Sequence, residues 1–204
     1  MKYAQLEEKP FATSFVDGTR PNGRLIKPHP FDFQNNNFVV SWWSKPIAGV
    51  YADRYFITGI SMGSTHSGYS YWHFGKADGS DRFRINLQNR GGGTVLEAVS
   101  DYFNPNDFWE QWHHFVVTKD DDKTFRLYVD GNLEVTLQFT DDFYPFLYPE
   151  IYCGAINYNG TISEGIELFS DMYIGKYRDK DGNVVWTDNY IKQVYENRAP
   201  FNAS

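Results

Sequence analysis

Two neighbouring segments carry the most informative pattern in the chain: Trp112-His113-His114-Phe115-Val116-Val117-Thr118 and, after a polar turn, Phe125-Arg126-Leu127-Tyr128-Val129-Asp130-Gly131. Both are rich in the β-branched and aromatic residues that suit a half-buried strand. Asp130-Gly131-Asn132 supplies residues that tolerate a positive φ, which predicts a tight hairpin over residues 129–133. These segments therefore favour consecutive antiparallel strands.

The same composition recurs on both sides of this hairpin. Short segments rich in Val, Ile, Phe, Tyr and Trp alternate with clusters of Gly, Asn, Asp and Pro, which is typical of a many-stranded antiparallel domain. We predict strands over residues 38–44, 55–61, 70–74, 82–88, 95–99, 112–119, 125–129, 133–139 and 166–177. One helix is predicted near the C-terminus, where Tyr190, Ile191, Val194 and Tyr195 share a helical face and Thr187 or Asp188 caps the first turn.

Successive side chains of a strand point to opposite faces of its sheet, so the sequence also predicts faces. In residues 82–88, the apolar side chains Phe83, Ile85 and Leu87 fall on one face and the polar ones on the other. The adjacent Trp42 and Trp43 must likewise point in opposite directions. We expect one of them in the core and the other outside it.

The 204 residues lie within the range of one large domain, and we expect a single domain over residues 1–204 with its core between about 31 and 198. The net charge of -7 provides no general basic field for nucleic acid, and no apolar run reaches the roughly 18 residues of a membrane-spanning helix. Neither nucleic acid nor membrane insertion is therefore expected. The single cysteine, Cys153, excludes an intrachain disulfide and is expected to be buried. The N-terminal residues lack a secretory-signal pattern.

The two quoted segments resemble the "WHHxxxT…LYVDG" hairpin of the concanavalin A-like lectin/glucanase superfamily, especially its laminin G-like and pentraxin-like domains. Two further segments match in order: Phe38-Val39-Val40-Ser41-Trp42-Trp43-Ser44-Lys45-Pro46 resembles an early strand, and residues 169–175 followed by 190–195 resemble the closing strand and helix. The matches span about residues 31–198. The resemblance implies an all-β fold, a two-sheet antiparallel jelly-roll sandwich with a short C-terminal helix and one concave face.

Several functions occur in this superfamily, including lectins, carbohydrate-binding modules, adhesion domains and polysaccharide-degrading enzymes. From the resemblance we expect a non-catalytic carbohydrate- or receptor-binding module, within a larger cell-surface protein or a phage virion or tail protein. Its partner would be a glycan or a glycosylated receptor, and its location extracellular, on a cell surface or on a virion. A glycoside hydrolase or lyase of the same fold, and a purely structural assembly domain, remain open alternatives.

Catalytic patterns are sparse in the sequence. A retaining glycosidase needs two carboxyl groups about 5 to 5.5 Å apart, whereas the nearest candidates, Glu167 and Asp171, would lie about 13 Å apart by strand rise. His113 and His114 belong to the hairpin and are expected to be hydrogen-bonded structural groups. No catalytic residue is therefore assigned.

The candidate ligand-binding residues are Trp72, His73, Arg84, Asn86 and Gln88, together with one of Trp42 or Trp43. A sugar needs a flat aromatic ring for its C–H face and planar amide or guanidinium groups for its hydroxyls, and these residues supply both. No cofactor is required, but a structural Ca²⁺ is an open expectation, because Asp171 matches a calcium ligand of relatives in the closing strand. Asp120-Asp121-Asp122 is expected to be a solvated charged turn.

Overall fold

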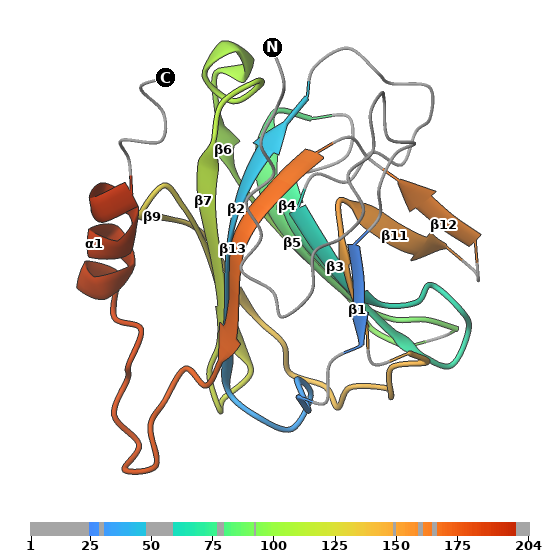
Figure 1. Ribbon diagram of the computed structural model, residues 1–204. Helices are drawn as coiled ribbons and strands as arrows, with labels where there is room; N and C mark the ends of the chain where they lie inside the picture. The colour runs from blue at the N-terminus through green and yellow to red at the C-terminus, as the bar shows by residue number, and fades with distance from the viewer. Residues whose placement is uncertain are drawn as a thin grey trace, which may run out of the picture.

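A computed structural model describes residues 25–28, 31–47, 59–76, 80–91, 93–148, 150–158, 161–164 and 167–198. Two antiparallel sheets face each other in it (Figure 1). The six-stranded sheet has the order β1 (Leu25–Pro28), β10 (Glu150–Cys153), β3 (Gly59–Gly63), β4 (Ser70–Lys76), β5 (Arg82–Asn89) and β6 (Val95–Tyr102).

The five-stranded sheet has the order β13 (Glu167–Gly175), β2 (Phe38–Pro46), β7 (His113–Lys119), β8 (Thr124–Val129) and β9 (Asn132–Gln138). A separate hairpin pairs β11 (Ala155–Tyr158) with β12 (Thr161–Glu164), and a 3-10 turn, η1 (Pro105–Asp107), precedes β7. Helix α1 (Asp188–Arg198) follows the last strand. This arrangement is the predicted two-sheet jelly-roll sandwich with a short C-terminal helix.

The predicted strands agree with the observed ones to within a few residues, with two kinds of exception. Strands β1, β10, β11 and β12 were not predicted, because each has four residues and offers no length over which alternation can be recognised. Residues 55–58 of the predicted strand 55–61, and Ile166 of the predicted strand 166–177, lie outside the described residues. The predicted hairpin is confirmed: Asp130 and Gly131 have φ values of 51° and 80° and connect β8 directly to β9.

The core lies between the two sheets and follows the predicted alternation. Phe83, Ile85 and Leu87 of β5 belong to it, and so do Trp42 of β2 and the buried Cys153. The aromatic rings make edge and stacked contacts with one another, such as Trp42 on Phe115 at a centroid distance of 5.3 Å. Many of the aromatic residues, which make up 19% of the chain, therefore lie in the interior.

Helix α1 covers the outer face of the five-stranded sheet (Figure 1). Its Ile191 packs with Val116 and Tyr128 in a second apolar cluster. Thr187 caps the helix, since its hydroxyl accepts from the Tyr190 amide at 3.2 Å. One of the two predicted caps, Thr187, is therefore confirmed.

Trp42 and Trp43 point to opposite sides, as predicted, but both are buried. Trp43 is only 5% exposed, because it stacks on His114 at 5.0 Å and on Tyr195 of α1 at 6.0 Å. The expectation that one of the pair would remain outside a core was wrong. Alternation does not reveal that a distant helix covers the second face.

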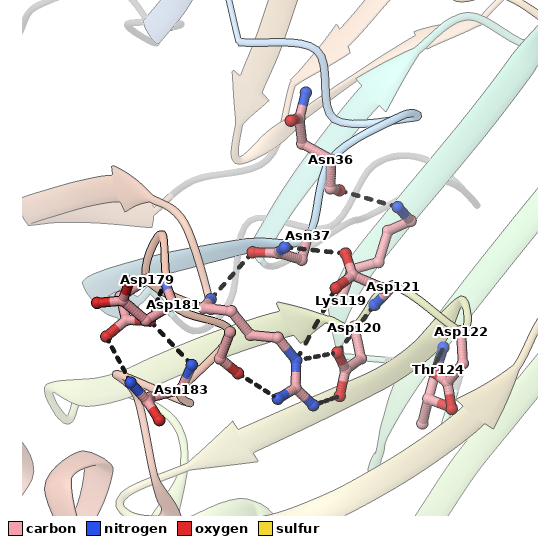
Figure 2. A network of polar contacts seen from close by, with 12 residues as sticks. Asn36, Asn37, Lys119, Asp120, Asp121, Asp122, Thr124, Asp179, Asp181 and Asn183 are labelled. Carbon is pink, nitrogen blue, oxygen red and sulfur yellow. Dashed lines mark hydrogen bonds and ion pairs between the residues drawn. The ribbon is translucent and has the colours of Figure 1, made fainter.

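The turn after β7 is more than a solvated charge cluster. Asp120, labelled in Figure 2, accepts two hydrogen bonds from Arg178, each 2.7 Å long. Arg178 lies in the segment between β13 and α1. Asn37, just before β2, joins the network by accepting from the Arg178 amide at 2.9 Å. The prediction of a solvated turn was wrong for Asp120, although Asp121 and Asp122 are exposed. This network fixes the path of the chain towards the covering helix.

Candidate ligand-binding site

A row of polar side chains runs along the outer face of the six-stranded sheet. Arg84, Asn86 and Gln88 point to this face because their apolar neighbours on β5 point into the core. Strand pairing places His73 of β4 and Glu97 of β6 directly opposite Asn86. We call these five residues, together with Arg90, the polar row.

Hydrogen bonds link the members of the polar row. Arg84 Nε donates to His73 Nδ1 at 3.1 Å, and Asn86 Nδ2 donates to Glu97 Oε2 at 2.7 Å. Gln88 Nε2 donates to Asn86 Oδ1 at 2.6 Å, and Arg90 Nη1 in turn donates to Gln88 Oε1 at 2.9 Å. Because each side chain is fixed by its neighbour, the row presents an ordered set of planar groups rather than freely rotating ones.

The row is deepest in its middle and more open towards β6. The side chain of Arg84 is 15% exposed and that of Glu97 is 44% exposed, whereas His73 is fully buried. His73 therefore serves as a hydrogen-bond partner of Arg84 on the neighbouring strand and does not face solvent. Arg84, Gln88 and Glu97 are the members of the row whose side chains have solvent-exposed surface that a ligand could contact.

Tyr102 extends this face, and the sequence interpretation did not include it. Strand β6 continues to Tyr102, three residues beyond the predicted end at Val99, and the side chain is 74% exposed. The guanidinium carbon of Arg82 lies 4.4 Å from the centre of its ring. An exposed aromatic ring with an arginine against it therefore stands beside the polar row.

A local irregularity explains why Tyr102 was missed. Simple alternation from Val99 would send Tyr102 towards the core, but the register between β5 and β6 shifts between Arg82 and Arg84. The backbone amide of Phe83 donates to the Ser100 hydroxyl at 2.9 Å at this point. A bulge of this kind changes which face a side chain takes, and the sequence signal for it is weak.

The structure separates Trp72 from the other predicted ligand-binding residues. His73, Arg84, Asn86 and Gln88 share the outer face, whereas Trp72 points into the core and has no exposed surface. Its ring is surrounded by aromatic neighbours, including Phe143 at a centroid distance of 4.7 Å and Phe146 at 4.8 Å. Trp72 has no ring face open to a sugar in this arrangement.

Asp171, the candidate calcium ligand, lies on the exposed closing strand. It has a φ of 50° at an irregular position of β13, and its Oδ2 accepts from the Ser170 hydroxyl at 3.0 Å. Within the described residues, no group of three or more His, Cys, Asp or Glu side chains is arranged to hold a metal ion. Calcium binding at Asp171 stays a prediction.

Glu167 has the most perturbed carboxyl group of the described chain. Burial raises its pKa to about 8, against the opposing effects of the Ser44 hydroxyl and the Gly59 amide, which donates to Oε2 at 2.9 Å. The register shift between Ser170 and Tyr173 puts Asp171 at an irregular position, whereas Glu167 pairs regularly with Pro46. Glu167 therefore links β13 to β3 of the other sheet, and its hydrogen bond to Gly59 accounts for its position.

The two hairpin histidines make the structural contacts that the sequence led us to expect. His114 Nε2 lies 2.8 Å from the Ser41 hydroxyl beneath α1. His113 Nδ1 lies 2.6 Å from Asp130 Oδ2, and its Nε2 lies 3.0 Å from the Phe108 carbonyl oxygen. Both rings thus connect elements of the sandwich.

Solved structures with the same architecture include receptor-binding and carbohydrate-binding domains. The binding domain of botulinum neurotoxin serotype D superposes with a TM-score of 0.60 at 18% identity, covering 86% of this chain and 40% of that one. The CBM40 domain of a Ruminococcus gnavus IT-sialidase, bound to α2,3 sialyllactose, gives a TM-score of 0.57 at 13% identity, covering 78% and 83%. At these identities the similarity establishes the fold, and the chain spans less than half of the toxin domain.

The binding domain of botulinum neurotoxin DC, solved in complex with rat synaptotagmin II, gives a TM-score of 0.55 at 14% identity, covering 85% of this chain and 40% of that one. A sequence comparison with curated proteins finds no match. Within the described residues, no helix is long and apolar enough to cross a membrane.

The family description of the concanavalin A-like lectin/glucanases superfamily matches residues 17–165, more than half of the chain. Together with the jelly-roll sandwich, this match shows that the chain belongs to the concanavalin A-like lectin/glucanase superfamily.

Proposed function

We propose that this chain is a non-catalytic binding module that recognises a glycan, free or on a receptor, through the outer face of β4, β5 and β6. The observation that carries the proposal is the exposed ring of Tyr102 beside the ordered polar row. A sugar ring can place its C–H face on Tyr102 while its hydroxyls meet the planar amide and guanidinium groups. Such a module would act outside the cell, on a cell surface or on a virion, where glycans are displayed.

The charge of this face favours an acidic glycan. Arg82, Arg84 and Arg90 lie along β5 and its end in a protein whose net charge is -7, and among the described residues only Arg84 has a carboxylate partner there, Glu97 at 3.6 Å. The Arg82 side chain makes no hydrogen bond or ion pair within the described residues, and its Nε is buried without a hydrogen-bond partner there. A carboxylate or sulfate on the sugar would satisfy this guanidinium, which gains from a planar, two-pronged acceptor.

Two of the similar structures support this direction. The sialidase CBM40 domain is described with a sialylated trisaccharide, and the neurotoxin DC binding domain with synaptotagmin II. Both are binding domains rather than catalytic ones by their descriptions. They support a recognition role for this fold, while the choice of ligand here rests on Tyr102 and the three arginines.

Glycan-array screening followed by calorimetry tests the proposal. The wild-type protein should bind a set of acidic glycans, and Tyr102→Ala should weaken the affinity by about 1–3 kcal/mol, since stacking on an aromatic ring carries a contribution of that order in other ligand systems. Tyr148→Ala provides a matched control, because Tyr148 is also exposed but belongs to the segment before β10 and not to β4, β5 or β6. Equal losses in the two variants, or no glycan binding at all, would contradict the proposal.

The same glycans serve to test the enzymatic alternative. After incubation with the protein, each polysaccharide is assayed for new reducing ends and for unsaturated uronates that absorb ultraviolet light. We expect neither product. Turnover that depends on a carboxyl group of the chain would replace the binding proposal with a hydrolase or lyase.

A further inference from the structure

A separate cavity of about 220 Å³ opens at one end of the sandwich. It lies where the edge strands β6 and β9 approach each other, beside the β8–β9 hairpin and the η1 turn. Its volume is below the roughly 300 to 1,000 Å³ of pockets that enclose drug-sized ligands. The cavity therefore suits one side chain or a similarly small group.

Three phenylalanine rings form the apolar wall of this cavity. The rings of Phe83 and Phe103 stack at a centroid distance of 4.6 Å, and Phe108 lies 4.8 Å from Phe103. Phe83 and Phe108 are almost fully buried, whereas Phe103 is partly exposed. The wall thus offers a rigid aromatic surface of the kind that attracts both apolar stems and cations.

Asp130, which also lines the cavity, is held in place by hydrogen bonds. Its Oδ2 lies 2.6 Å from His113 Nδ1, and its Oδ1 accepts from the His114 amide at 2.9 Å. His113 Nε2 lies 3.0 Å from the Phe108 carbonyl oxygen. These contacts fix the position of the Asp130 carboxyl group at the cavity wall.

Two further carboxyl groups line the cavity without a cation to balance them. Asp107 accepts a hydrogen bond from Asn104 at 3.0 Å, which does not offset its charge. The side chain of Glu134, which also lines the cavity, makes no hydrogen bond or ion pair within the described residues. Burial, followed by repulsion from Asp130 and Asp101, raises the pKa of Glu134 above its ordinary value. No Lys or Arg is among the residues that line the cavity.

We propose that this cavity binds the ammonium or guanidinium end of a lysine or arginine side chain presented by a protein partner. The apolar stem would pack against Phe103, and the cationic end would reach Glu134 and Asp107. A cation is favoured over an anion or a neutral sugar because it alone would relieve the repulsion around Glu134. This inference is independent of the glycan proposal, since the cavity shares no residue with the polar row.

Protein-observed NMR with small probes tests the inference. The probes are the N-acetyl methylamides of arginine and lysine, and the neutral counterpart is the same derivative of citrulline, which keeps the shape of arginine without its charge. We expect the cationic probes to shift the amide signals of residues around Phe103 and Glu134 in a saturable manner. Equal binding of the citrulline derivative, or no shifts at these positions, would overturn the proposal.

Two variants test whether the carboxyl groups of Glu134 and Asp107 bind the cationic probe. Glu134→Gln combined with Asp107→Asn should weaken binding of the arginine derivative at least about tenfold, because charge-assisted hydrogen bonds are lost. Asp142→Asn is the control, since Asp142 is a fully exposed carboxylate that does not line the cavity, and it should leave this affinity unchanged. Retained affinity in the double variant would overturn the proposal.

A measurement on the wild-type protein covers the case in which the double variant does not fold. The pKa of Glu134, followed by the carbon chemical shift of its carboxyl group, should fall when the arginine derivative is added, because a nearby cation favours the charged form. An unchanged pKa at saturating probe would contradict the inference. Glycan binding should be the same with and without the probe, so failure here and failure of the proposed function are distinguishable.

Discussion

The outer faces of the two sheets differ in what covers them. On the five-stranded sheet, Trp43 and Val116 point outwards but are buried against helix α1 and the segment that precedes it. On the outer face of β5 and β6, arginines and amides form a hydrogen-bonded row, and Tyr102 stands exposed at its edge. The first face contributes to stability as a second core, whereas the second keeps surface available for a ligand.

This difference separates two uses of the same strand pattern. Outward positions alternate with inward ones on both sheets, but their chemistry follows what lies above them. An aromatic side chain under a helix adds packing energy, whereas one in the open adds little to folding and offers a surface for recognition. The contrast can be measured by substituting comparable aromatic residues on the two faces.

The largest effect is expected for Trp43→Ala. Removing this ring from between His114 and Tyr195 should lower the free energy of unfolding by about 3–5 kcal/mol, the usual cost of truncating a buried large aromatic residue. Tyr102→Ala should cost less than about 1 kcal/mol, since mainly its contact with Arg82 is lost. Urea denaturation of both variants gives the comparison. Similar losses would mean that the six-stranded face is also a packing surface.

A smaller effect is expected for the polar contact that holds the start of the helix. The buried Tyr128 hydroxyl of β8 donates to Asp188 Oδ1 at 2.8 Å at the start of α1. Tyr128→Phe should lower stability by about 1.5 kcal/mol, since a hydrogen bond to a charged group is lost. Amide hydrogen exchange should increase in α1 more than in β4 and β5. Equal acceleration in both regions would show that the helix does not cover its sheet independently.

The smallest effect concerns the network that leads the chain to the helix (Figure 2). Hydrogen bonding from Arg178 holds the pKa of Asp120 below its ordinary value of 3.8. Stability from this contact is therefore fully present above the unfolded-state pKa and is lost as pH falls through the lower folded value. Asp120→Asn should reduce stability modestly at neutral pH and flatten the decline below about pH 4.

Urea denaturation of the wild type and of Asp120→Asn at several pH values between neutral and acidic gives the stability of each protein as a function of pH. Asp142→Asn is a suitable control, because Asp142 is a fully exposed carboxylate whose partner is Lys123. It should leave the acid limb unchanged. If the wild type and Asp120→Asn lose stability identically as pH falls, the contact between Asp120 and Arg178 does not help to hold the segment between β13 and α1.

Most of the fold could be predicted because long strands reveal themselves by alternation. The residue order of Arg82–Asn89 is sufficient to predict its apolar and polar faces, and the Asp130-Gly131 pair predicts a hairpin turn. The four-residue strands, including Glu150–Cys153, could not be predicted in this way, since their position depends on neighbours that are distant in sequence.

The candidate site was only partly predictable for a similar reason. Arg84, Asn86 and Gln88 follow from alternation, and His73 from its place on the adjacent strand. Tyr102 depends on a bulge, and the 220 Å³ cavity depends on two edge strands that belong to different sheets. Trp72 is of a residue type that suits sugar binding, but its side chain is buried in the core.

The order of residues is sufficient to specify which side chains share a face, where the chain turns, and to which superfamily it belongs. These properties depend on local geometry, namely the two-residue repeat of a strand and the positive φ of Asp130 and Gly131. The folded arrangement is needed to specify which parts of each outer face are covered and which are open. That outcome depends on where α1 packs and on the bulge beside Tyr102, because burial is set by contacts between segments that are far apart in the chain.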